Sequence, residues 1–143
     1  MNQQILDYIK NQRIGVFAVE MLDGSPHAAT LHFANSDSPL VFYFRTEKTY
    51  RKSESLIKNT ETRGSFVVGV DEANMQTFQA DGIARLVISS ELEVFEKIYL
   101  SKFPEKKKTD LDKSIVFSFT PTWWRYTNFN GPNGKLIISS EDK

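Results

Sequence analysis

The 143-residue sequence contains no cysteine. This absence excludes disulfide bonds, thiolate metal sites and cysteine nucleophiles. Histidine is also scarce, with only His27 and His32 present. Because the spacing between them is odd, these two side chains fall on opposite faces of a strand, and one chain cannot bring them together into a single site.

Motifs that carry hydrolytic or nucleotide chemistry are missing as well. The sequence has no HExxH metal motif, no GxSxG nucleophile elbow, no P-loop and no GxGxxG. Acid, base and nucleophile chemistry therefore have few candidate residues. Redox chemistry performed by a bound cofactor is the better-supported class of function.

Charge and apolar runs limit the partners. Eighteen basic residues balance eighteen acidic ones, so no overall field attracts nucleic acid or an anionic membrane. No apolar run approaches the ~20 residues of a membrane helix. Residues 1–10 contain Asp7 and lack the basic start and apolar centre of a signal peptide. We expect one cytoplasmic domain over 1–143, with no nucleic-acid or membrane partner.

Short apolar segments separated by turn residues predict a mainly β protein. Asp23-Gly24 predicts a tight hairpin turn with two positive-φ positions, and residues 35–39 predict another turn. Pro121 is expected at a bulge or an edge. The predicted strands are 14–21, 26–34, 40–46, 64–70, 77–88, 115–119 continuing as 122–129, and 135–139.

Three short helices are predicted at 2–11, 49–59 and 90–103, the last beginning at Ser90 because Ser90-Glu91-Leu92-Glu93 has the form of a capping box. The run Lys106-Lys107-Lys108 that follows is expected to be a solvated loop. About seven strands without regular βαβ alternation predict a mostly antiparallel barrel with peripheral helices.

The segment 45–52 joins a predicted strand to a predicted helix and indicates an anion site. Arg51 and Lys52 would lie in the first helical turn, where the helix dipole favours acidic residues. A phosphate would accept the free N–H donors, a hydroxyl from Thr46 or Thr49, and both basic side chains. The alternative is that both are solvated charges paired with nearby glutamates.

These pieces occur in the order of a known family. The chain has the hairpin Asp23-Gly24-Ser25-Pro26-His27-Ala28-Ala29-Thr30, a strand over 40–44 ending in Arg45-Thr46, the pair Arg51-Lys52, and the strand Gly82-Ile83-Ala84. Over about its whole length it resembles the FMN-binding split barrels of the pyridoxamine 5′-phosphate oxidase-like superfamily. The resemblance implies a split β-barrel that forms a homodimer and holds FMN between the subunits.

The resemblance also implies site residues. Arg51 and Lys52 would hold the FMN phosphate, with Arg45 and Thr46 at the end of the preceding strand. Gln79 would make a polar contact to the ring. Either Trp123 or Trp124 would stack at the subunit groove, with core packing as the alternative for both. The isoalloxazine would lie along a run of small and apolar residues, Ala28, Ala29, Thr30 and Leu31.

Two departures from the family pattern bear on activity. The phosphate helix is followed by Asn59-Thr60 instead of Asn-Pro, and the Arg-x-His-Asp-Arg segment that holds the substrate phosphate of the true oxidases is missing. We therefore expect a small FMN-dependent oxidoreductase of unknown substrate that is not a pyridoxamine phosphate oxidase. The alternatives are a non-enzymatic flavin protein and a barrel that binds deazaflavin or haem. A nucleic-acid-binding barrel is the remaining, less favoured interpretation.

Overall fold

Antiparallel pairing joins eight strands into one sheet in the computed structural model, which describes residues 1–69 and 71–142. The strands are β1 (Ile14–Glu20), β2 (Pro26–His32), β3 (Ala34–Asp37), β4 (Leu40–Glu47), β5 (Thr62–Val68), β6 (Gln76–Leu86), β7 (Ser114–Gly131) and β8 (Gly134–Ser139). Their order is β2-β1-β5-β6-β7-β4-β3, with β8 paired to β7. The predicted mainly β split barrel is confirmed.

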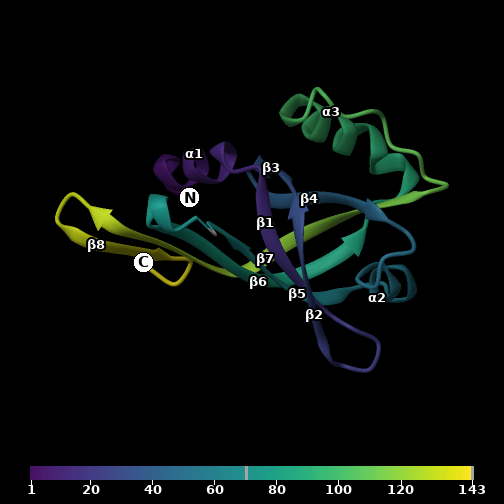
Figure 1. The fold of residues 1–143 in the computed structure, drawn as a ribbon, viewed down its shortest axis with the longest axis horizontal. Coiled ribbons are helices and arrows are strands. Elements are labelled where there is room, and N and C mark those ends of the chain that lie inside the picture. The colour runs from purple at the N-terminus through teal and green to yellow at the C-terminus, as the bar shows by residue number, and fades with distance from the viewer. Residues whose placement is uncertain (70, 143) are drawn as a thin grey trace.

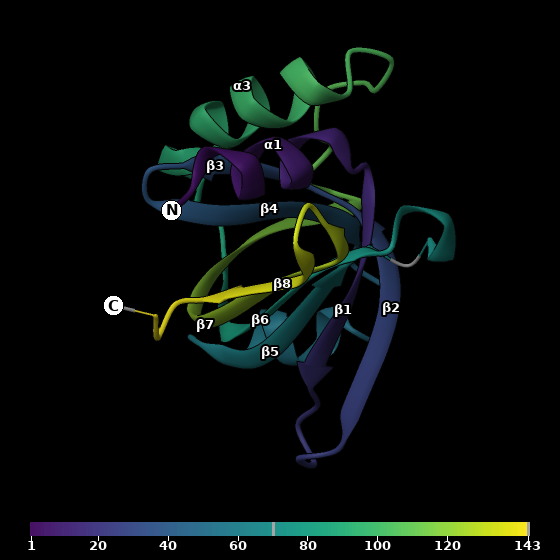
Figure 2. The ribbon, with the colours of Figure 1, turned by 90° about the vertical axis from the view of Figure 1, so that its left-hand side faces the viewer.

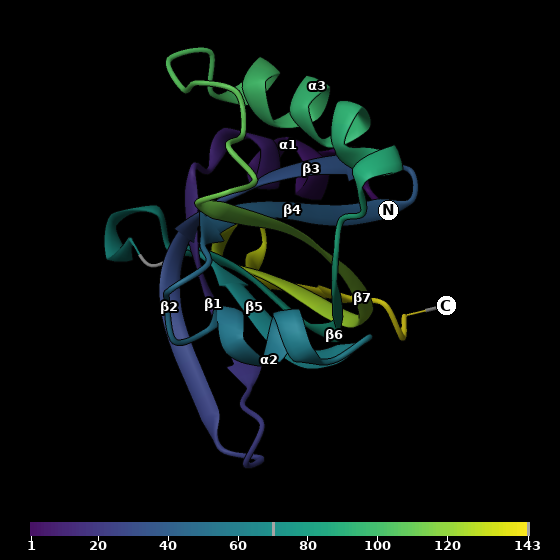
Figure 3. The ribbon, with the colours of Figure 1, turned by 90° about the vertical axis from the view of Figure 1, so that its right-hand side faces the viewer.

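The sheet curls until β2 and β4 approach each other without forming a hydrogen-bonded ladder. Figure 3 shows these two strands meeting at one end of the curled sheet. We call this opening between β2 and β4 the seam. The β7–β8 hairpin extends away from the barrel and carries the C-terminus (Figure 1).

Helices cover two sides of the barrel. The helices are α1 (Gln3–Asn11), α2 (Ser53–Lys58) and α3 (Leu92–Lys102), with single 3-10 turns η1 (Glu72–Asn74) and η2 (Ser89–Glu91). Both α1 and α3 contact β3 and lie above it in Figure 2. On the other side, α2 packs against β6 (Figure 3). Over residues 1–69 and 71–142, none of these helices has the length and apolar character to span a membrane.

The core is built largely from phenylalanine. Phe66 lies at its centre, with ring centroids 4.9 to 5.1 Å from those of Phe33, Phe42 and Phe44. From the helix side, Ile5 and Ile9 of α1 are fully buried against the same cluster. Inward side chains alternate along each strand, so the core fixes which residues of β2 and β4 face the seam.

Two strand predictions needed correction. Residues 34–37 form β3, paired with β4, so the predicted turn shrinks to the tip of this hairpin. The segments 115–119 and 122–129 form one continuous strand, β7. As predicted, Pro121 lies beside a bulge, which interrupts the register between Asp81 and Gly82. A Cβ atom at Gly82 would come within 2.2 Å of the Thr120 carbonyl oxygen, so only glycine fits there.

The hairpin turn and two helix starts also differ from the predictions. Only Gly24 has a positive φ, of 83°, while the Asp23 carboxylate accepts the Ser25 N–H at 3.0 Å. The third helix begins at Leu92, not at Ser90, because the turn η2 precedes it; the Glu91 carboxylate accepts the Ile88 N–H at 3.3 Å and so caps η2.

The second helix begins at Ser53, not at Thr49, because tight turns occupy the connection from β4. Backbone N–H groups of Tyr50 and Ser53 close these turns onto Glu47 and Tyr50, and the Ser53 hydroxyl donates to the Glu47 carbonyl at 2.7 Å. Arg51 and Lys52 therefore precede the helix instead of forming its first turn. The helix-dipole part of the anion-site argument is wrong.

Candidate functional site

A pocket of about 430 Å³ lies at the seam between β2 and β4. We call it the seam pocket. Four of the predicted cofactor residues line it, two from each strand. Its lining residues are Thr30, Leu31, His32, Arg45, Thr46, Glu47, Tyr50, Tyr99, Lys106 and Ser114. The barrel therefore brings together the end of β2 and the end of β4.

Thr46 lines this pocket and carries a polar side-chain atom without a partner among residues 1–69 and 71–142. Its side chain points to the inner face of β4 and is 6% exposed. Its Oγ1 is buried and has no hydrogen-bond partner. A buried hydroxyl without a partner costs about 1–3 kcal/mol, and such a group is a candidate for binding a ligand.

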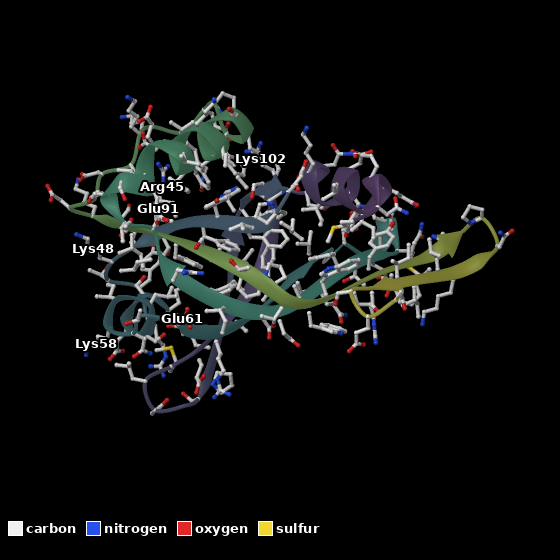
Figure 4. All side chains as sticks on the ribbon, turned by 180° about the vertical axis from the view of Figure 1, so that it is seen from behind. Arg45, Lys48, Lys58, Glu61, Glu91 and Lys102 are labelled. Atoms are coloured by element: carbon white, nitrogen blue, oxygen red, sulfur yellow. The ribbon has the colours of Figure 1, made fainter. Side chains whose placement is uncertain are left out.

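Arg45 is half-buried and holds the loop after α3. Its Nη1 donates to the Lys107 carbonyl at 2.7 Å and to the Thr109 hydroxyl at 3.3 Å, and its guanidinium carbon lies 5.2 Å from the Tyr99 ring centroid. Arg45 lies between α3 and the strands beneath it (Figure 4). Only one guanidinium nitrogen is used in these bonds, so the others remain available to a ligand.

Six further residues line the pocket that the sequence analysis did not select as cofactor residues, among them His32, Tyr99 and Lys106. The Lys106 ammonium donates to the Tyr99 hydroxyl at 3.3 Å and faces Nδ1 of His32 at 3.3 Å. Lys106 is half-buried, so the prediction that the lysine run is a solvated loop holds for Lys107 and Lys108 but is wrong for Lys106.

The seam pocket has an excess of positive charge. Arg45 and Lys106 face a single lining carboxylate, Glu47, which is exposed. Burial, and then the neighbouring positive charge of Arg45, lower the pKa of Lys106. Burial and the Lys106 charge lower the pKa of His32, which favours the neutral form of its imidazole. An anionic group entering the pocket would be stabilised by this charge.

Lys52 lies next to the pocket and is 5% exposed. Its ammonium is 4.5 Å from the ring centroid of Tyr50, a lining residue, and burial lowers its pKa. Arg51, in contrast, is exposed. Within residues 1–69 and 71–142 neither forms an ion pair, so the predicted alternative of pairing with nearby glutamates does not occur.

The remaining β2 residues lie on two faces of the strand. Ala29 and Leu31 point inward, and Ala28 and Thr30 point outward. Thr30 shares an outward row with Gln79, since the register joins Thr30 to Val16, Val16 to Val67 and Val67 to Gln79. Three strand spacings separate Thr30 and Gln79 by about 14 Å. Gln79 is therefore not part of the seam pocket of its own chain.

The two tryptophans lie on opposite faces of β7, as their adjacency predicts. Trp124 stacks on Phe78 with centroids 6.0 Å apart and an interplanar angle of 21°, and it packs against the core. Trp123 has the Arg125 guanidinium 5.3 Å above its ring. Trp124 therefore has a packing role in the single chain, and its contact with a flavin remains a prediction.

The site offers binding groups more than reactive ones. In the part of the chain that the structure describes, no three His, Asp or Glu residues are grouped as a metal site. The polar lining groups are hydroxyls, cations, one imidazole and the exposed carboxylate of Glu47. This arrangement suits the binding and orientation of an anionic cofactor that supplies its own chemistry.

Comparisons with known proteins bear on the fold. No family model matches the sequence, and no curated protein matches it either. Several solved structures, in contrast, match the fold of this chain. A proposed pyridoxamine 5′-phosphate oxidase from Listeria innocua superposes with a TM-score of 0.67 and 23% identity, covering 88% of this chain and 97% of its own. A protein from Clostridium acetobutylicum related to general stress protein 26 (pyridoxinephosphate oxidase family) gives a TM-score of 0.64 and 16% identity, covering 97% and 94%.

A haem-binding protein from Mycobacterium smegmatis has the same fold. It superposes with a TM-score of 0.71 at 13% identity; the match covers 92% of this chain but 54% of that protein, so the chain spans about half of its length. The chain therefore has the split-barrel fold of the pyridoxamine 5′-phosphate oxidase-like proteins. A haem-binding protein shares this fold, so the fold alone does not define the cofactor.

Proposed function

We propose that this protein binds FMN at the seam between β2 and β4 and acts as a small cytoplasmic FMN-dependent oxidoreductase. The observation that carries the proposal is the buried hydroxyl of Thr46, unpartnered among the described residues, at the wall of a pocket with excess positive charge. The fold supports the proposal as an analogy. The substrate is a small molecule whose identity is open.

The phosphate end of FMN fits the β4 side of the pocket. The Thr46 hydroxyl would donate to a phosphate oxygen, and Lys52 and the free nitrogens of Arg45 would supply charge-assisted hydrogen bonds. Lys52 is already buried without an ion pair, so part of the desolvation cost of binding is met before the ligand arrives. Arg51, being exposed, would contribute through its longer-range charge.

The ring would lie along Ala28 to Leu31 of β2, where small side chains permit close approach. Gln79 lies about 14 Å from Thr30 in the same chain. A Gln79 side chain that contacts a flavin ring beside Thr30 would therefore come from a second chain. This requirement supports a homodimer formed by the outward face of β1, β2, β5 and β6, where Val16 and Val67 are only partly buried. Sedimentation at micromolar concentration is expected to give a dimer; a monomer with FMN bound would contradict it.

Bound FMN supplies two-electron redox chemistry. The residues of this chain bind and orient it. His32, Tyr99 and Lys106 would form the rim beside the ring, and their hydrogen bonds to one another hold this rim in place. No side chain is assigned as a catalytic acid or base. Turnover with a reduced nicotinamide would distinguish an oxidoreductase from a flavin protein that binds without catalysis.

Haem is the second candidate, because of one specific observation. His32 is exposed at the pocket, its pKa is lowered, and Lys106 occupies only Nδ1. A neutral imidazole with a free Nε2 is the usual protein ligand of haem iron. The M. smegmatis protein of the same fold binds haem by its description.

The visible absorption spectrum of the purified protein, recorded before and after addition of FMN and separately of haemin, tests these candidates. We expect flavin absorption that stays with the protein through gel filtration. The variant His32→Ala separates the two ligands, since it keeps every residue assigned to the FMN phosphate and should abolish any histidine-ligated haem spectrum. Retention of haem, but not of FMN, would refute the proposal, and retention of a deazaflavin alone would change the ligand class.

A further inference from the structure

A second pocket, of about 610 Å³, lies between α1, β3 and α3. We call it the helix pocket. It shares no lining residue with the seam pocket, because α3 presents Tyr99 to the seam and Lys97, Ser101 and Lys102 to the helix pocket. Its lining residues are Lys10, Asn11, Ala34, Asn35, Ser36, Asp37, Lys97, Ile98, Ser101 and Lys102.

The helix pocket carries an uncompensated positive charge. Three lysines, Lys10, Lys97 and Lys102, line it against one carboxylate, Asp37. That carboxylate already accepts a hydrogen bond from Asn35 at 2.8 Å. Across the described residues 1–69 and 71–142, none of the three lysines forms an ion pair.

Lys102 distinguishes this pocket from an ordinary basic surface. Its ammonium nitrogen is buried and has no hydrogen-bond partner among the residues that the structure describes. It lies 4.0 Å from the centroid of Phe33 and 5.9 Å from that of Phe103. Figure 4 shows Lys102 where α3 faces α1. The attraction of a cation to a ring face is worth about 0.5–2 kcal/mol, which offsets only part of the cost of burying an unpaired charge.

The charge on Lys102 is disfavoured by its surroundings. Burial, with a smaller effect from the Arg13 charge, lowers its pKa to about 8. An anion bound beside it would stabilise the protonated form and remove this penalty. The side chain is long and flexible, so its ammonium can move from the Phe33 ring into the pocket to meet such an anion.

We propose that the helix pocket binds a small organic anion, with a phosphate or carboxylate group held by Lys102 and Lys97 and an apolar body against Ala34 and Ile98. The volume falls within the range of small-molecule sites. Ala34 and Ile98 are the apolar lining residues, and the other eight are polar or charged. The Asn11 amide supplies a further donor at the rim. The proposal does not depend on FMN binding at the seam.

Pyridoxal 5′-phosphate is a suitable probe, because it joins a phosphate, an aromatic ring and an aldehyde that condenses with a lysine amine, releasing water. Borohydride then reduces the imine to a stable secondary amine, and peptide mass spectrometry locates the adduct. The matched reagent is 5′-deoxypyridoxal, which carries the same ring and aldehyde without the phosphate. We expect about one adduct per chain on Lys102 or its neighbour Lys97, at a half-saturating concentration at least tenfold lower for the phosphate-bearing probe.

Two variants locate the anion. Lys97→Glu places a carboxylate in the pocket and is expected to raise the half-saturating concentration at least tenfold, whereas Lys108→Glu changes an exposed lysine outside the pocket and leaves it unchanged. Lys97 is itself exposed, so the variant is expected to fold; the thermal transition checks this. Inorganic phosphate in excess is expected to compete with the probe.

Several outcomes would overturn the proposal. Equal half-saturation by the two aldehydes would mean that Lys102 is merely reactive and that no anion site exists. Adducts spread over exposed lysines would refute a specific pocket, and so would an unchanged half-saturating concentration of the phosphate-bearing probe in Lys97→Glu. Adducts confined to Lys52 or Lys106 would assign the anion to the seam and remove the helix pocket from consideration.

Discussion

Replacing Thr46 by valine should affect FMN binding and the stability of the ligand-free protein in different directions. The Thr46 hydroxyl is buried and makes no hydrogen bond in the chain, so its removal takes away an unsatisfied group and keeps the shape of the side chain. We expect the free energy of unfolding without ligand to stay constant or to rise by up to about 1 kcal/mol.

FMN binding is expected to weaken in the same variant. A hydrogen bond to a charged group contributes about 1.5–3 kcal/mol, which corresponds to a roughly 10- to 160-fold increase in the FMN dissociation constant. Quenching of flavin fluorescence during a protein titration measures this constant, and urea unfolding monitored by tryptophan fluorescence measures stability.

Thr62→Val is the matched control. Thr62 is equally buried, at 3% exposure, but its hydroxyl donates to the Ser55 carbonyl at 3.3 Å, away from the seam. This variant should lose about 0.5–1.5 kcal/mol of stability and retain its FMN affinity. If Thr46→Val loses as much stability as Thr62→Val while its FMN dissociation constant is unchanged, Thr46 is a structural residue and the argument for the seam site fails.

Three further predictions address charge and substrate. Lys52→Met should weaken FMN binding by about 1.5–3 kcal/mol. The control Lys48→Met, at an exposed position of the same connection (Figure 4), should leave FMN binding unchanged. Equal FMN dissociation constants for the two variants in a titration would show that Lys52 has a purely structural role. The pKa of Lys102 is lowered from 10.5 to about 8 in the folded chain, so between these pH values the unfolded chain holds the extra proton and the free energy of unfolding should rise with pH. Urea unfolding at several pH values should show a smaller rise in Lys102→Met than in the unmodified protein. Parallel plots of unfolding free energy against pH for the two proteins would contradict the assignment. The FMN-loaded protein should not oxidise pyridoxamine or pyridoxine 5′-phosphate at a useful rate, because Arg125 lies over Trp123 and the segment that holds the substrate phosphate in the oxidases is missing. The absorbance of pyridoxal phosphate, with oxygen as electron acceptor, measures this reaction. Efficient formation of pyridoxal phosphate would show that other residues form the substrate site.

Local sequence patterns were sufficient for the barrel and for part of the seam. The apolar run over 14–21 and the Asp23-Gly24 turn predicted the β1–β2 hairpin, and the split-barrel fold followed from a family resemblance whose pieces span about the whole chain. Arg45 and Thr46 could be selected because they end a strand next to a basic cluster. The structure brings both into one pocket with Thr30 and Leu31.

The residues that the sequence did not reveal converge through tertiary packing. His32 lies far in the chain from Tyr99 and Lys106, and it meets them because α3 packs over β3 and directs its following loop toward the seam. Lysine runs are usually solvated, and nothing in the local pattern separates Lys106 from its neighbours. The sequence did not reveal the burial of Lys52 either, because turns closed by Ser53 replace the predicted helical turn.

The direct test of the central claim is a comparison of FMN and riboflavin affinities, measured by fluorescence titration of the purified protein under identical conditions. The two ligands differ only in the phosphate, so the ratio of their dissociation constants isolates the group assigned to Thr46, Lys52 and Arg45. One charge-assisted hydrogen bond of about 1.5 kcal/mol already corresponds to roughly a tenfold preference. The seam site predicts that FMN binds at least tenfold more tightly than riboflavin. Equal affinities, or no binding of either flavin, would contradict it.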